Sequence, residues 1–193
     1  MLYLRSRAAP ATAVAMLVCA VALWAIGLAV HDPQARALTA LLAALAATTA
    51  IGHGLGGPDH DLDKTAAIAW QPRRAAHIIV AGAAVLAALA ATALAGEQIT
   101  NASLLARNVA GLTGLVALGA VGLGAAQAPL LPVIWTVVVL WWAPPLGEPP
   151  TRPTYKVVLT WMAQPPDARA ATIAAVILAT AGVVTYAALG SRR

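Results

Sequence analysis

Charged residues are scarce in this sequence, and cysteine is almost absent. Asp, Glu, Lys and Arg make up 10% of the 193 residues, whereas an average soluble domain carries roughly a quarter. Hydrophobic residues make up 61%, and the mean hydropathy is +0.79. The single cysteine, Cys19, excludes a disulfide framework within the chain. Together with apolar runs of about 20 residues, this composition predicts an integral membrane protein.

Catalytic and nucleotide-binding motifs are also missing. The segment GLGGPDHDLDKT resembles a phosphate-binding loop, but Asp63 stands where that motif requires a glycine before Lys64. A nucleophile elbow, a zinc-protease motif and a kinase signature are absent from the sequence. We therefore expect neither an enzyme nor a cofactor bound by this chain.

The net charge of +5 does not indicate a nucleic-acid partner. The basic residues flank apolar segments one or two at a time, so they form no continuous face for a phosphate backbone. This pattern is typical of topology determinants and contacts with membrane lipid headgroups.

Six apolar segments predict transmembrane helices, since about 20 residues span the roughly 30 Å hydrocarbon core of a bilayer. We expect an all-α, single-domain bundle over residues 1–193, with a cytoplasmic loop at 56–74 and an outer segment at 147–169. Prolines interrupt the outer segment, and its apolar part, Tyr155 to Gln164, is too short to span. A re-entrant or interfacial piece is therefore predicted there. The six spans are residues 8–30, 37–55, 75–96, 104–124, 130–146 and 170–190.

The even number of spans places both termini on one side of the membrane. That side receives seven Lys and Arg residues, and the opposite side receives five. The bias is clearest around the first span, which Arg5 and Arg7 precede and Asp32 follows. Because basic residues favour the cytoplasmic side, we expect a plasma-membrane protein with both termini and the 56–74 loop in the cytoplasm.

The fourth span carries two notable features. Arg107 lies near its start, either as an interfacial side chain that reaches the headgroups, close to Glu97, or as a charge lining a substrate path. Small residues also recur every three or four positions, which lets a neighbouring helix approach closely. We therefore expect this helix to pack inside the bundle. The small residues are Gly111, Gly114, Ala117, Ala120 and Gly124.

A polar segment from Gly54 to His77 interrupts the apolar sequence, with three of the seven acidic residues of the chain and two of its four histidines. Pro58 and Pro72 bracket a stretch, Asp61 to Trp70, that predicts a short helix. Aspartates in its first turn suit the positive end of the helix dipole. Its apolar face predicts a helix that lies on the membrane or docks into a groove.

The polar segment is open to three interpretations. A metal site could draw on His53, Asp59, His60, Asp61, Asp63 and His77, although no closed-site spacing is present. Haem ligation could use His53 and His77, which lie near consecutive spans. A docking helix for a cytoplasmic partner is the interpretation that we favour. Whether His53, His60 and His77 bind anything stays open.

The layout resembles the permease subunit of a type-2 ABC exporter. The resemblance lies in six helices, a cytoplasmic helix between the second and third, a minimal link between the fourth and fifth, and a broken outer segment. The most similar stretches are LDKTAAIAWQPRR at Leu62 to Arg74 and LLARNVAGLTGL at the opening of the fourth span. The first corresponds to the coupling-helix region of that family.

This resemblance implies a partner ATPase in the cytoplasm, which would hold ATP and magnesium. It also implies a second permease copy or a sister permease, and export of an apolar or amphipathic substrate by alternating access. Substrate identity and the choice between homodimer and heterodimer stay open. The alternative function is a membrane anchor or cytochrome b-like haem-binding subunit of a redox complex. The residues implied in the ATPase contact are Asp61, Leu62, Asp63, Lys64, Thr65, Ala66, Trp70, Arg73 and Arg74.

Overall fold

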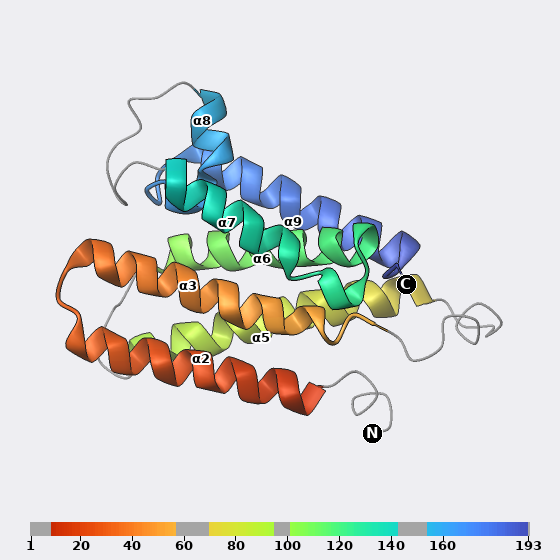
Figure 1. Cartoon of the computed structure of the whole chain (residues 1–193), viewed down its shortest axis with the longest axis horizontal. Coiled ribbons are helices and arrows are strands. Elements are labelled where there is room, and N and C mark those ends of the chain that lie inside the picture. The colour runs from red at the N-terminus through yellow and green to blue at the C-terminus, as the bar shows by residue number, and fades with distance from the viewer. Residues whose placement is uncertain (1–8, 57–69, 95–100, 143–153, 193) are drawn as a thin grey trace.

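The computed structural model describes residues 9–56, 70–94, 101–142 and 154–192, and these residues form an all-helical bundle (Figure 1). Five helices are long and apolar enough to cross a membrane. The chain is therefore a polytopic α-helical membrane protein. The long helices in chain order are α2 (Ala9–Ala29), α3 (Pro33–Gly52), α5 (Trp70–Leu94), α6 (Ala102–Gly122), α7 (Leu130–Trp142) and α9 (Arg169–Leu189).

Helix α2 is the long helix that is not among these five. It has 21 residues without a charged side chain, and its described apolar part is Ala13–Ile26. The predicted count of six spans therefore stays a prediction.

The helices α2 to α9 run back and forth, so α2 begins and α9 ends at the same end of the bundle (Figure 1). We call this end the N/C end, and the opposite end, where α3 and α9 begin, the far end. Two contacts tie the N/C end together: the Tyr186 hydroxyl donates to the Leu55 carbonyl at 3.0 Å, and the Arg192 amide donates to the Ala120 carbonyl at 2.9 Å.

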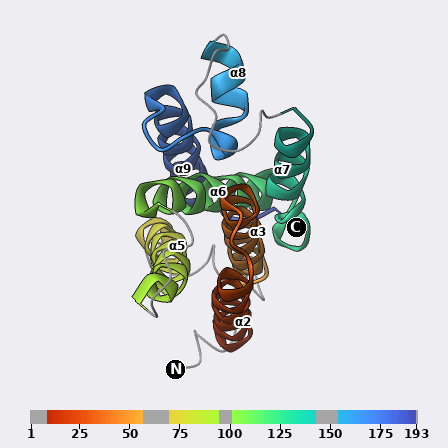
Figure 2. The same cartoon turned by 90° about the vertical axis from the view of Figure 1, so that its left-hand side faces the viewer.

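Helix α6 lies in the middle of the bundle, as predicted. Helices α7 and α9 lie on one side of it and α3 and α5 on the other, with α2 outermost beside α3 and α5 (Figure 2). About 72% of its spanning window is buried. All five small residues predicted to form its packing stripe are buried, which confirms the expectation.

The closest helix crossing joins α6 to α9 at two glycines. A Cβ atom at Gly114 would overlap the backbone of Leu178, and a Cβ atom at Gly182 would overlap the backbone of Gly114. Glycine is therefore required at both positions, because the two backbones touch directly.

Two predicted helix starts lie too late in the sequence. Helix α3 begins at Pro33 rather than at residue 37, because the Asp32 carboxylate accepts the Ala35 amide at 2.7 Å and proline suits the first helical position. Helix α5 begins at Trp70 rather than at residue 75. Pro72 falls in its first turn, where the backbone N–H groups have no helical partner, so the proline breaks nothing.

The remaining boundaries agree within a few residues. Helix α6 begins after Asn101, which accepts the Ser103 amide at 2.9 Å. Its end leads through Gly124, at φ 97°, into a short 3₁₀ turn, η1 (Ala125–Gln127), which is the minimal link expected before α7. The predicted fifth span extends to residue 146, and its last four residues lie outside the described part of the chain.

Candidate functional site

The predicted ATPase contact falls partly on residues that the structure describes. Its members at positions 61–66, Asp61, Leu62, Asp63, Lys64, Thr65 and Ala66, lie outside the described part, as does the rest of the expected docking helix up to position 69. Trp70, Arg73 and Arg74 are described, and all three lie in the first turns of α5 at the N/C end. They are therefore part of a long, apolar helix rather than of a separate loop.

These three residues make contacts within the N/C end. The Arg73 guanidinium carbon lies 5.7 Å from the centroid of the Trp70 ring, within the range of a cation–π interaction. The Arg74 guanidinium lies against Gly190, the residue that ends α9 at φ 74°. A cation suits this position because the C-terminus of a helix carries partial negative charge. The start of α5 is thus held to the end of α9.

The far end contains a buried polar junction that involves Arg107. The guanidinium, in a side chain only 6% exposed, donates to the Pro165 carbonyl at 2.9 Å and also to the Gln164 carbonyl. The expectation of a snorkelling side chain is wrong, because the charge binds protein carbonyls and not lipid headgroups. Its suggested neighbour, Glu97, lies outside the described residues. The interpretation as a path-lining charge stays a prediction.

The carbonyls that bind Arg107 belong to the outer segment. There, α8 (Thr154–Leu159) and the 3₁₀ turn η2 (Trp161–Ala163) pack against α7 and α9, and η2 is fully buried. Trp161 is 0% exposed, and its ring lies where a Cβ atom at Gly111 would be. The expected short apolar piece is therefore observed as two short helical turns, of which η2 is buried in the far end of the bundle and α8 is mostly exposed.

Other polar residues of this junction were not predicted. The Asn108 side-chain amide donates to the Met162 carbonyl at 3.2 Å, and the Gln164 amide donates to the Thr160 hydroxyl at 2.7 Å. All of these groups are buried. Asn108 is the one sequence feature that indicates this junction, because a side-chain amide directly after an arginine within an apolar helix needs polar partners.

The junction is incompletely hydrogen-bonded within the described chain. Four of its buried polar atoms have no partner there: Arg107 Nε, Asn108 Oδ1, Trp161 Nε1 and Gln164 Oε1. Two are donors and two are acceptors. An unpaired buried group costs about 1–3 kcal/mol. These unpaired atoms therefore offset part of the stability that the Arg107 hydrogen bonds give the junction.

The histidines form no closed metal site in the described chain. No group of three or more His, Cys, Asp or Glu residues occurs there. His60 and the acidic residues that complete the suggested ligand set, Asp59, Asp61 and Asp63, lie outside the described part. His53 follows α3 and is exposed, while His77 is half-buried in α5. The two histidines of the haem hypothesis do lie at the same end.

The fold and its two ends define a polytopic helical membrane protein with a central small-residue helix, a basic N/C end and a buried polar junction at the far end. Scans of family models, curated proteins and solved structures found no match to this chain.

Proposed function

We propose that this chain is the transmembrane permease subunit of an ATP-driven exporter. It would lie in the plasma membrane with six spans and both termini in the cytoplasm. Its own residues would bind neither ATP nor magnesium; a separate cytoplasmic ATPase would hold both. A second copy of the chain or a sister permease would complete the path.

The continuity of α5 is the single observation that carries this proposal. This helix runs without interruption from Trp70, within the polar segment, to Leu94 at the far end. A helix about 37 Å long transmits a displacement of one end to the other, since each residue adds about 1.5 Å. A partner that moves the 61–69 segment therefore moves α5, which packs against α6 and α9.

The contact with the ATPase would use the polar segment and the first turns of α5. Asp61, Leu62, Asp63, Lys64, Thr65 and Ala66 would dock into the partner, and Trp70, Arg73 and Arg74 would join that surface to the bundle. Closure of two ATPase subunits on ATP would shift the permeases between inward-open and outward-open states.

The polar junction at the far end supports the second half of this cycle. Export requires an outer region with two arrangements of similar free energy. The outer segment is held by the Arg107 hydrogen bonds, and yet four polar atoms around it lack partners in the described chain. Movement of α6 relative to η2 would exchange one set of hydrogen bonds for another and release the segment. An apolar or amphipathic substrate, whose identity stays open, would leave by this route.

The test is reconstitution of the chain with the ATPase that copurifies from its native membrane. In proteoliposomes, ATP hydrolysis and the efflux of a fluorescent phospholipid analogue are measured together. The charge reversals Asp63→Lys and Lys64→Asp are expected to lower ATP-dependent efflux at least tenfold while hydrolysis continues. The control, Arg169→Asp, reverses an exposed charge at the far end and suits the start of α9. Unchanged efflux in the Asp63 and Lys64 variants, or copurification of no ATPase, would contradict the proposal.

The second candidate is a haem-binding subunit of a redox complex. It is favoured by the location of His53 and His77 at the same end of the bundle. A Soret band in the purified protein that is lost in His53→Ala and kept in His31→Ala, at the far end, would support this candidate over the permease. A featureless visible spectrum would refute it.

A further inference from the structure

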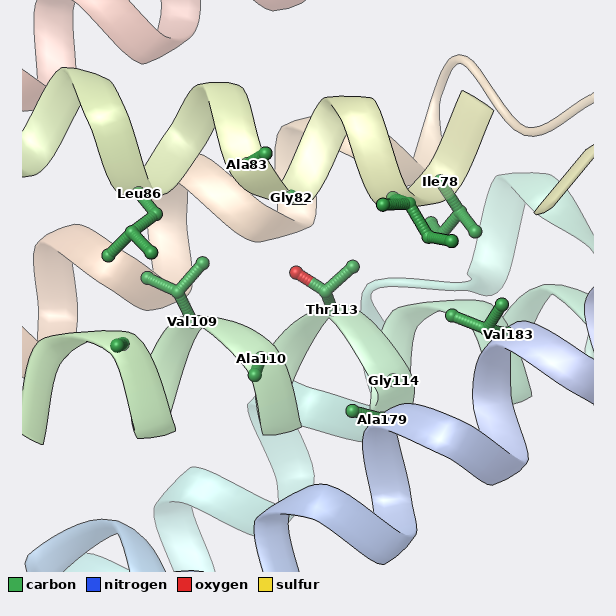
Figure 3. Close-up of a pocket in the computed structure, with 12 residues that line it drawn as sticks. Ile78, Gly82, Ala83, Leu86, Val109, Ala110, Thr113, Gly114, Ala179 and Val183 are labelled. Carbon is green, nitrogen blue, oxygen red and sulfur yellow. The ribbon is translucent and has the colours of Figure 1, made fainter. Parts of the chain in front are cut away.

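An apolar groove opens on the bundle between α5, α6 and α9 (Figure 3). Its volume is about 200 Å³. It lies at the middle of these helices, because Gly82 is the central residue of α5, Ala179 is the central residue of α9, and both line it. In spanning helices this level corresponds to the hydrocarbon core of the bilayer, away from both headgroup layers. A ligand of this groove therefore enters from hydrocarbon.

The groove is open toward the outside of the bundle and closed toward its core. Ile79 is 55% exposed, and Ala83 and Ala110 are also exposed on the two facing helices. Ile78 and Val109 line the groove as well, and both are buried. A molecule dissolved in the bilayer can therefore reach the groove sideways.

Thr113 is the only polar side chain among the described residues that line the groove. It is 7% exposed, and its hydroxyl has no hydrogen-bond partner among the described residues. The side chain points from α6 toward Gly82 of α5, into the space between the helices (Figure 3). A Cβ atom at Gly82 would lie 3.2 Å from the hydroxyl oxygen, so the glycine leaves room beside this hydroxyl.

The Thr113 hydroxyl differs from those of the other buried or half-buried threonines of the described long helices. Each of the others donates to a carbonyl three or four residues earlier in its own helix, as is common for helical threonines. They are Thr39, Thr48, Thr49, Thr92, Thr136 and Thr185. Because an unpaired polar group is costly in hydrocarbon, the Thr113 hydroxyl indicates an acceptor that the described chain does not supply.

Size and polarity select the occupant of the groove. Water needs about two to four polar partners, and the described lining offers one. A helix with its side chains is about 10–12 Å across, and drug-sized ligands fill roughly 300–1,000 Å³, so both are too large. A lipid acyl chain has no acceptor along its length and leaves the Thr113 hydroxyl unpaired. A cavity of about 150 Å³ takes up benzene, so the groove suits one ring with small substituents.

We propose that the groove binds a compact, uncharged molecule the size of one substituted ring, whose single oxygen accepts a hydrogen bond from Thr113. Simple phenols and cyclic ketones belong to this class. The apolar walls bury the ring, and no described lining residue carries a charge that could balance a charged ligand. The site is independent of the proposed export function, because it requires neither a partner subunit nor ATP.

The test is photolabelling of the full chain in phosphatidylcholine nanodiscs with tracer amounts of a phenol that carries a small alkyl diazirine. Tandem mass spectrometry is expected to place the label within residues 78–86 and 106–114, a result that depends on no substitution. Two unlabelled compounds then compete with the label. They are p-cresol and p-xylene, which has nearly the same shape but cannot accept a hydrogen bond. The concentration of each compound that halves the labelling is measured.

Thr113→Val keeps the shape of the side chain and removes its hydroxyl. It is expected to raise the half-inhibiting concentration of p-cresol about fivefold, the usual effect of one neutral hydrogen bond, and to leave that of p-xylene unchanged. Partition into the bilayer cancels, because wild type and variant are measured in the same lipid. Thr39→Val removes a hydroxyl outside the groove and is expected to change neither concentration.

The volume of the groove is tested separately. The double variant Ala83→Leu, Ala110→Leu fills the groove and is expected to lower the labelling at least fivefold. The matched control, Ala84→Leu with Ala87→Leu, adds the same volume at exposed positions of α5 that do not line the groove. It is expected to be labelled like the wild type.

Four results would overturn the proposal. The first is label confined to other parts of the wild-type chain, and the second is an unchanged p-cresol concentration in Thr113→Val. The third is groove labelling that neither compound reduces, because the groove would then hold an acyl chain. The fourth is a wild-type dimer on size-exclusion chromatography that the groove-filling variant converts to monomer, because the occupant would then be a second copy.

Discussion

The contact between Gly114 and Gly182 makes the crossing of α6 and α9 sensitive to a single methyl group. In Gly114→Ala the new Cβ atom would overlap the carbonyl of Leu178 and the Cα atom of Ala179. These atoms belong to the backbone of α9, so no rotamer change can remove the overlap. The two helices must move apart along the interface that connects the centre of the bundle to α9.

The magnitude follows from two opposing effects. Alanine favours a helix interior over glycine by up to about 1 kcal/mol. Overpacking of a tight core costs about 1–3 kcal/mol, and the upper part of that range applies here because backbone must move. Gly114→Ala is therefore expected to lower the free energy of unfolding by about 1–2 kcal/mol, or roughly 5- to 30-fold in the equilibrium constant.

Gly122→Ala is the matched control, because no atom of the described residues lies within 4 Å of a Cβ atom at this position of the same helix. It is expected to leave the free energy of unfolding unchanged or to raise it by up to about 1 kcal/mol. The assay is titration of both variants from mixed micelles with sodium dodecyl sulfate, followed by circular dichroism. Equal midpoints for the two variants would refute the inferred backbone contact.

Two further predictions concern the far end and the topology. Arg107→Met keeps the approximate length of the side chain but removes two charge-assisted hydrogen bonds, each worth about 1.5–3 kcal/mol. Because relief of the buried charge offsets part of this loss, the free energy of unfolding should fall by about 2–4 kcal/mol in the same titration. An unchanged free energy of unfolding would contradict the hydrogen bonds. The topology is tested with two single-cysteine variants, Pro166→Cys and Ala126→Cys, each in a Cys19→Ser background; the two exposed positions lie at opposite ends of the bundle. An impermeant maleimide added outside intact cells should label the cysteine at 166, and it should label the cysteine at 126 only after the cells are opened. The reverse pattern would place the N/C end outside.

Much of the fold could be predicted from local sequence. The helix ranges agree within a few residues wherever the structure describes them, because apolar, uncharged stretches of sufficient length become helices in hydrocarbon. The starts of α3 and α5 lie before the predicted residues 37 and 75. Pro33 and Pro72 fall in the first turns of these helices, where proline is compatible with a helix.

The candidate site was less predictable. Trp70, Arg73 and Arg74 lie in the first turns of α5 rather than in the predicted loop, and their contact with an ATPase stays a prediction. Arg107 was recognised as unusual, whereas its partners lie 57 and 58 residues further along the chain. Asn108 and Gln164 were not singled out at all, because neither belongs to a motif.

The sequence by itself determined the class of the protein, the positions of its helices and the central place of α6, since these depend on apolar length and on the spacing of small residues along one segment. Only the tertiary structure decided that Arg107 holds the outer segment, that Gly114 meets Gly182, and that α5, α6 and α9 enclose an apolar groove. The physical reason is that helices form through hydrogen bonds between residues four positions apart. Contacts between helices depend instead on how each helix is rotated and shifted against its neighbours, which no local pattern specifies.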